Sequence, residues 1–322
     1  MLDRVYHNPR VTWDRAKHKK VAVAILDSGL ELSDDQQAKY FNECKITYKN
    51  WVDGVDVKTS WKNGRDNTGH GTHLSTLLEK VAPEADIYVA RVFGGRQPEM
   101  DKDLPNIAQA IRHAVNSWKV DIIVMSLGWD VTPRQHENED LCAIRAIRHA
   151  ADKGVAIFAA ASNDGKNKLR GVAWPARMEE VICVHSFDGH GNPSKFTPSP
   201  DENNTLAVLG EGIVAAWPKR LRAQGERSRS GTSFAALIAA AMAAVVLDYS
   251  RRFLDNEEWE ELRRVGGLRR MFSQLKNHKT SGYTYVLPWE TFNADRSEEW
   301  IQEEIRTAVG LRRVPKEPEK SR

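Results

Sequence analysis

Short runs of apolar residues, each ended by polar or turn-forming residues, recur between residues 21 and 185 of this chain. The first run is VAVAIL at 21–26, and the others occupy 87–92, 122–126, 155–161 and 181–185. A strand buried on both faces has this unbroken apolar character, whereas a strand with one wet face alternates apolar and polar residues. The runs therefore predict the inner strands of a sheet that is covered on both sides.

The segments between these runs show helical spacing. Apolar residues recur three or four positions apart at Ile107, Ile111, Ala114, Val115 and Trp118, and again at Leu141, Ile144, Ile147 and Ala151. Such spacing places apolar side chains on one helical face. Strands that alternate with helices predict an α/β fold, a three-layer α/β/α arrangement around a mostly parallel sheet.

The 322 residues divide by composition. We expect a polar N-terminal arm at 1–20 and one α/β domain at 21–250, a length that such a domain can fill. Charged residues and Trp dominate after residue 250, and 297–311 has amphipathic spacing, so a helical extension packed on the domain is expected at 251–311. The Pro- and charge-rich tail at 312–322 is typical of a linker.

Bulk properties exclude several functional classes. The net charge of +3 gives no reason to expect nucleic acid or a membrane surface as a partner. The apolar run at 235–247 is too short to cross a bilayer and predicts a buried helix. The N-terminus lacks the apolar core of a secretory signal, and Cys44, Cys142 and Cys183 do not form a disulfide pattern. We therefore expect a cytoplasmic protein.

Three polar residues occupy positions suited to chemistry. Asp27 ends the first predicted strand, and ligands gather at the carboxyl ends of strands in parallel sheets. His70 is bracketed by two glycines ahead of a predicted helix. Ser233 opens the apolar helix, where the helix dipole favours developing negative charge. Taken singly, Asp27 could equally be a helix cap, and for Ser233 a helix cap is the better explanation.

Two further readings stay open at this level. His70 and His73 could bind a metal ion from one helical face, although no Glu accompanies them as in H-E-x-x-H. Asn163 precedes Asp-Gly and could be a turn residue, or its amide could donate to an oxyanion. Peptide hydrolysis needs a hydroxyl nucleophile, a base, an orienting carboxylate and an oxyanion donor. The chain offers all four.

The stretches AILDSG, GHGTH and SGTSFAA, in this order, resemble the signatures around the catalytic residues of the subtilisin-like serine peptidases, the subtilases. The resemblance runs from about residue 21 to 246. It implies Asp27 as the orienting acid, His70 as the general base, Ser233 as the nucleophile and Asn163 as the oxyanion donor. The implied activity is endopeptidase cleavage of polypeptides without a cofactor.

The same resemblance implies a substrate-binding edge and a specificity pocket. One wall is expected from Ser126, Leu127 and Gly128, and the other from Ala160, Ala161 and Ser162. The family usually has glycine at the position of Ser162 and proline at that of Leu237. No calcium loop interrupts the segment after His70, so no metal site and no metal dependence are expected.

The resemblance is nearest to intracellular subtilase domains of fungi, since no inhibitory propeptide is visible before Asp27. A fused or regulatory module is the expected restraint. The alternative function is a catalytically silent subtilase fold used for interaction. A nucleotide-binding domain is less favoured, because LDSGLELSDD after the first strand lacks G-x-G-x-x-G.

Overall fold

The computed structural model of the protein describes residues 19–41, 46–52, 62, 64–129, 137–165, 171–203, 205–275, 277–287, 292 and 296–310. Across these residues the main sheet has nine strands in the order β10-β11-β7-β6-β5-β4-β1-β3-β2, and all its pairs are parallel except β10 with β11. A separate antiparallel hairpin joins β8 and β9. The mostly parallel sheet predicted from the sequence is confirmed.

The predicted apolar runs form its central strands, within one or two residues at each end. The strands are β1 (Ala22–Asp27), β2 (Ile46–Asn50), β3 (Asp86–Arg91), β4 (Ile122–Met125), β5 (Ala156–Ala160), β6 (Ile182–Phe187), β7 (Leu206–Leu209), β8 (Ile213–Ala216), β9 (Glu226–Arg229), β10 (Asn277–Thr280) and β11 (Tyr283–Val286). Strand β1 lies between β3 and β4, with Ile25 opposite Val89 on one side and Val124 on the other.

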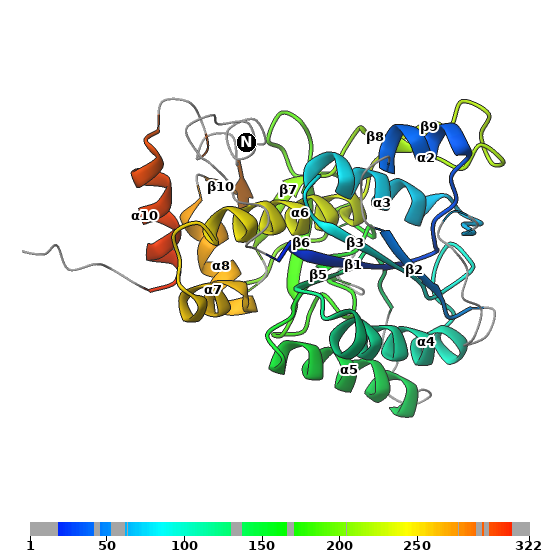
Figure 1. Ribbon diagram of the computed structural model, residues 1–322, viewed down its shortest axis with the longest axis horizontal. Coiled ribbons are helices and arrows are strands. Elements are labelled where there is room, and N and C mark those ends of the chain that lie inside the picture. Colours follow the sequence, from blue (N-terminus) through cyan, green and yellow to red (C-terminus); the bar gives the residue numbers. More distant parts are fainter. Residues whose placement is uncertain are drawn as a thin grey trace, which may run out of the picture.

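Helices cover both faces of the sheet (Figure 1). They are α2 (Asp34–Phe41), α3 (His70–Val81), α4 (Met100–His113), α5 (Glu137–Asp152), α6 (Thr232–Ser250), α7 (Asn256–Arg263), α8 (Val265–Gln274) and α10 (Glu298–Ala308), and a π-helical turn, Ala114–Trp118, extends α4. Alternation along β1 shows the layering. Val23 and Ile25 belong to the core shared with α3 and α6, whereas Ala24 and Leu26 belong to the core shared with α4 and α5.

Helix α6 runs through the centre of one layer. It is the one helix in the described residues that is long and apolar enough to cross a membrane, but 94% of its apolar stretch is buried inside the protein. It is therefore the core helix predicted from the sequence. The helix is continuous through Leu237, which is fully buried, so leucine fits where the family usually has proline.

The C-terminal extension differs from its prediction as a helical addition. Besides α7, α8 and α10 it contains β10 and β11, and β11 pairs in parallel with β7 of the main sheet. Strands β10 and β11 thus extend the main sheet. A capping box between Asp255 and Glu258 starts α7, and Ser297 caps α10 by accepting the backbone N–H of Trp300.

The order of the strands brings the candidate site residues together. Strands β5, β4 and β1 are neighbours, and their carboxyl ends lead directly to Ser162 and Asn163, to Ser126 and to Asp27. Because parallel strands end at the same edge of a sheet, residues far apart in the sequence meet there.

Candidate active site

Asp27 and His70 form a close pair at this edge. Asp27 is the last residue of β1 and is fully buried, and His70 is the first residue of α3. The ring nitrogen Nδ1 of His70 lies 2.8 Å from Oδ1 of Asp27, and the backbone N–H of Ser28 donates to the same oxygen at 2.8 Å. A carboxylate is an acceptor, so this contact places the imidazole proton on Nδ1 and leaves Nε2 free to accept a proton.

A second buried carboxylate, Asp66, organises the turn before His70. The backbone N–H groups of Thr68, Gly69 and Thr72 donate to its two oxygens at 3.0, 2.8 and 2.8 Å, and the hydroxyl of Ser28 donates at 2.9 Å. Asp66 therefore holds both the approach to α3 and its first turn. Sequence reasoning missed this residue, although an Asp shortly before a glycine-bracketed histidine at a helix start was an available signal.

The glycines on either side of His70 allow close packing around it. A Cβ on Gly71 would lie 2.2 Å from the carbonyl oxygen of Gly29, and one on Gly69 would lie 2.3 Å from the ring of Trp217. Gly69 also has a φ of 80°, in the left-handed region that glycine tolerates. The start of α3 can therefore press against Gly29 and Trp217, which fixes the position of the imidazole.

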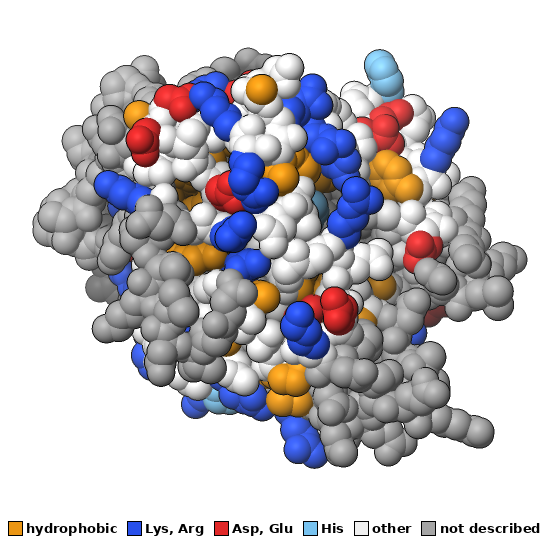
Figure 2. Space-filling view, turned by 90° about the vertical axis from the view of Figure 1, so that its right-hand side faces the viewer, with side chains coloured by type: hydrophobic (Ala, Val, Ile, Leu, Met, Phe, Trp, Pro, Cys, Tyr) orange, Lys and Arg blue, Asp and Glu red, His pale blue; other side chains and the backbone are white. Residues whose placement is uncertain are grey.

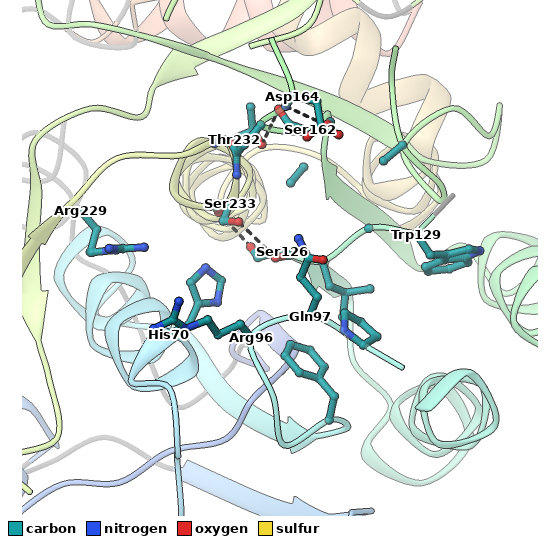
Figure 3. A pocket seen from close by; sticks show the side chains of 17 residues that line it. His70, Arg96, Gln97, Ser126, Trp129, Ser162, Asp164, Arg229, Thr232 and Ser233 are labelled. Carbon is teal, nitrogen blue, oxygen red and sulfur yellow. Dashed lines mark hydrogen bonds between the residues drawn. The ribbon is translucent and has the colours of Figure 1, made fainter. Parts of the chain in front are cut away.

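Ser233 is the second residue of α6, and Gly231 occupies the N-cap, so Ser233 is not a helix cap. Its hydroxyl donates to the carbonyl oxygen of Ser126 at 3.1 Å, and the hydroxyl of Ser126 donates to the carbonyl oxygen of Ser233 at 2.8 Å (Figure 3). The Ser233 hydroxyl thus donates to the residue that follows β4, and among the described residues it makes no hydrogen bond to His70. The sequence could not predict this contact.

Asn163 is oriented by the start of α6. Its side-chain oxygen accepts the backbone N–H of Thr232 at 2.9 Å and the Thr232 hydroxyl at 3.1 Å. Because those two donors require the oxygen on their side, the amide NH₂ of Asn163 is on the other side. The backbone N–H of Ser233 lies in the first turn of α6, where no intrahelical acceptor exists. The Asn163 amide and the Ser233 backbone N–H are thus two N–H donors from residues that line the same cavity.

These residues surround a cavity of about 470 Å³. Of the six residues predicted for the pocket walls, Ser126, Leu127, Gly128, Ala160 and Ser162 line it, together with His70, Asn163 and Ser233. Ala161 does not line it. The side chain of Ala161 is fully buried among apolar residues of the α4 and α5 layer, because successive side chains near the end of β5 point to opposite faces.

Ser162 has a φ of 133°, a conformation that side-chain-bearing residues rarely adopt. This explains why the family usually has glycine at the position. The Ser162 hydroxyl accepts the backbone N–H of Asp164 at 3.1 Å, a local bond that helps to hold the turn.

The pKa values of the two histidines of GHGTH are shifted in opposite directions. Burial works to lower the pKa of His70, but the adjacent Asp27 carboxylate, with a smaller contribution from Asp66, raises it above its ordinary value of 6.5. Burial lowers the pKa of His73 to about 4. Nε2 of His73 lies 3.1 and 3.0 Å from the carbonyl oxygens of Ile213 and Arg227, and because a carbonyl only accepts, this nitrogen is a donor. His73 is therefore a neutral structural residue, and this geometry speaks against the reading of His70 and His73 as a metal pair.

The features described above are the Asp27–His70 pair, the Ser233 hydroxyl, the Asn163 amide and the cavity, and they contain the residues that the sequence motifs indicated. A sequence profile of the subtilase family matches residues 18–266. The chain belongs to the subtilase family. Membership confirms the predicted family resemblance and the prediction of a serine-type endopeptidase. The three-layer fold agrees with that of the solved relatives of this subtilase.

Several curated proteins are similar to this subtilase. The major intracellular serine protease of Bacillus subtilis is 29% identical over 277 residues, which is 80% of each chain. A subtilisin-like protease of Podospora anserina is 32% identical over 245 residues, 70% of this chain and 64% of that protein. This subtilase thus spans less than two thirds of the length of the Podospora protein.

Solved structures share its fold. The epidermin leader peptide processing serine protease of Staphylococcus aureus aligns over 88% of this subtilase and 77% of that chain, with a TM-score of 0.66 and 21% identity. A lanthipeptide protease aligns over 84% and 87%, with a TM-score of 0.65 and 22% identity. Identities at this level concern the fold alone.

Proposed function

We propose that this subtilase cleaves polypeptides through Ser233 as nucleophile, His70 as general base, Asp27 as orienting acid and Asn163 as oxyanion donor. The observation that carries the proposal is the 2.8 Å contact between His70 Nδ1 and the buried Asp27, in the cavity that Ser233 and Asn163 also line. A base whose second nitrogen is anchored on a carboxylate keeps one tautomer and one orientation.

Acylation begins when the Ser233 hydroxyl leaves the Ser126 carbonyl and turns to Nε2 of His70. An extended substrate bound along Ser126, Leu127 and Gly128 presents backbone N–H groups, and one of these competes for the Ser126 carbonyl. Substrate binding thereby releases the hydroxyl that attacks. The hydrogen bond from Ser233 to Ser126 then belongs to the state before substrate binds, in which catalytic hydrogen bonds are often loose.

In the chemical step His70 takes the Ser233 proton as Oγ bonds to the scissile carbonyl carbon. The carbonyl oxygen becomes negative and receives hydrogen bonds from the Asn163 amide and the Ser233 N–H. His70 then gives its proton to the leaving nitrogen as the C–N bond breaks, which leaves an acyl-enzyme. Water repeats the sequence in deacylation and regenerates the free hydroxyl.

The test compares the wild type with Ser233→Ala in a digest of a peptide library, and labels both with a serine-directed fluorophosphonate. We expect the wild type to be labelled and to cleave, and Ser233→Ala to lose both properties. Ser228→Ala, at an exposed serine of β9, is the matched control and should retain both. Undiminished cleavage by Ser233→Ala would refute the mechanism.

A catalytically silent interaction module is the second candidate. The observation that favours it is the Ser233 hydroxyl bonded to Ser126 instead of His70. If the Ser233 hydroxyl cannot leave the Ser126 carbonyl, the folded wild-type protein stays unlabelled even after long incubation. Labelling of Ser233 excludes this candidate.

An intracellular, cytoplasmic setting and restraint by a further module or chain complete the proposal. The setting is supported by the names of the relatives from Bacillus subtilis and from Paenibacillus polymyxa, both called intracellular serine proteases. Fractionation of cells that express the tagged chain tests the setting.

A further inference from the structure

Two arginines line the cavity beside His70, and neither is used by the proposed mechanism. They are Arg96, in the segment after β3, and Arg229, the last residue of β9. Figure 3 shows both side chains close to His70, with Arg229 and Trp129 on opposite sides of His70 and Ser126. Substrate that fills the cavity must therefore pass at least one guanidinium.

Arg229 is half-buried and unpaired. Its Nε is buried without a hydrogen-bond partner, and within the described residues no carboxylate lies at salt-bridge distance from Arg229 or Arg96. Its guanidinium carbon lies 5.9 Å from the ring centre of Trp217, and that of Arg227 lies 4.7 Å from the same ring. The guanidinium groups of Arg227 and Arg229 thus both lie near the ring of Trp217.

The surroundings of Arg229 are unfavourable to its charge. Burial, followed by repulsion from Arg227 and Arg96, lowers the pKa of its guanidinium. A desolvated guanidinium among like charges gains most from an incoming carboxylate, to which it can present two parallel N–H donors. The face turned to the viewer in Figure 2 carries several blue Lys and Arg side chains near its middle, with a few red Asp and Glu side chains among them.

The position of Arg229 relative to the chemistry indicates which part of the substrate it meets. The acyl part of the substrate is assigned to the walls made by Ser126 to Gly128 and by Ala160 and Ser162. His70 hands its proton to the leaving nitrogen, so the leaving segment lies on the His70 side of the scissile bond. Arg229 lies beyond His70 in that direction (Figure 3).

We propose that Arg229, assisted by Arg96, selects substrates that carry Asp or Glu at the first or second position after the scissile bond. The inference rests on the proposed function, because it assigns a substrate class to the same cleft. Arg229 is a specificity-determining residue and takes no part in bond breaking.

The test uses pairs of peptides that differ only in Glu against Gln at one of these two positions. We expect kcat/KM to be about tenfold higher for the Glu peptide, the size of effect that one charge-assisted hydrogen-bond pair gives. Arg229→Gln should bring this ratio close to one, with cleavage of the Gln peptide retained. Arg229→Glu should reverse the preference, so that the Gln peptide is cleaved faster than the Glu peptide, and Arg96→Gln should lower the ratio in part.

Arg222→Gln is the matched control. Arg222 is exposed in the segment between β8 and β9 and does not line the cavity, so this substitution removes the same charge at a position outside the cavity. The control should keep the wild-type ratio. A wild-type ratio of one, or an equal loss of preference in Arg222→Gln, would overturn the inference and leave the proposed function standing. If the wild type neither cleaves nor reacts with the fluorophosphonate, the proposed function fails and the inference falls with it.

Discussion

The buried carboxylate of Asp66 offers the sharpest test of how this fold positions its histidine. The perturbation is Asp66→Asn, which keeps the shape of the side chain but replaces one oxygen by NH₂ and removes the charge. In the folded protein Oδ1 accepts the N–H groups of Thr68 and Gly69, and Oδ2 accepts the N–H and the hydroxyl of Thr72. The single oxygen of asparagine can serve only one of these two sets.

The expected cost follows from those contacts. A buried N–H left without an acceptor costs about 1–3 kcal/mol, and a hydrogen bond to a charged group contributes about 1.5–3 kcal/mol. Removing a negative charge that lies beside the N-terminus of α3 adds about 0.3–1 kcal/mol. Because these contributions overlap, we expect Asp66→Asn to lower the free energy of unfolding by about 3–5 kcal/mol, a large part of the roughly 5–15 kcal/mol of a typical protein.

Urea denaturation followed by circular dichroism measures this change, and peptide hydrolysis under native conditions measures kcat. We expect kcat to fall by about 10²-fold, because His70 begins the same helix and loses its fixed position. Asp188→Asn is the matched control. Asp188 also accepts two backbone N–H groups, those of His190 and Asn192, but it is only partly buried and does not line the cleft, so little change is expected. A stability of Asp66→Asn within about 0.5 kcal/mol of the wild type refutes the reasoning.

Four further predictions follow from the site. Asn163→Ala should lower kcat by about 10²–10³ with little change in KM, the typical cost of removing one oxyanion donor; a rise in KM at constant kcat contradicts the assignment. Activity should rise with pH through a midpoint above 6.5, because His70 must be neutral to act as a base and its pKa is raised; in Asp27→Asn the midpoint should move down. Ser162→Gly should raise the free energy of unfolding by about 1 kcal/mol, since relief of backbone strain exceeds the entropic cost of glycine, and should increase cleavage after large aromatic residues. Chelator should leave the melting temperature unchanged, and a large shift on adding calcium would reveal a site not predicted here.

The sequence predicted this architecture where the physical signal was local. Unbroken apolar runs marked β1, β3, β4, β5 and β6 because strands buried on both faces require them. Asp27, His70 and Ser233 stood next to turn glycines at the ends of such elements, and three motifs in one order made their joint occurrence informative. Each of these signals lies within about ten residues of chain.

What escaped prediction depends on direction or on distant contacts. The outline of the pocket required knowing which way Ala161 points at the end of β5, and a shift of one residue reverses that direction. Asp66 is an ordinary turn residue until the N–H groups of α3 are placed around it. The pairing of β11 with β7 joins residues about 80 positions apart, and the four-residue strand YTYV gives only a weak local signal.

The β10–β11 hairpin also determines what happens if the C-terminal segment is removed. With the hairpin present, β7 is an inner strand, and Tyr285 stacks on Phe187 with ring centres 4.7 Å apart. A chain that ended at Ser250 would turn β7 into an open sheet edge and uncover Phe187, a combination that promotes edge-to-edge aggregation. The outermost strand β10 instead presents the short polar sequence NHKT, whose lysine discourages further strand pairing. The C-terminal segment therefore protects the edge of the sheet that carries the active site. Proteolytic removal of the chain after α6 would cause aggregation before it changed the cleft.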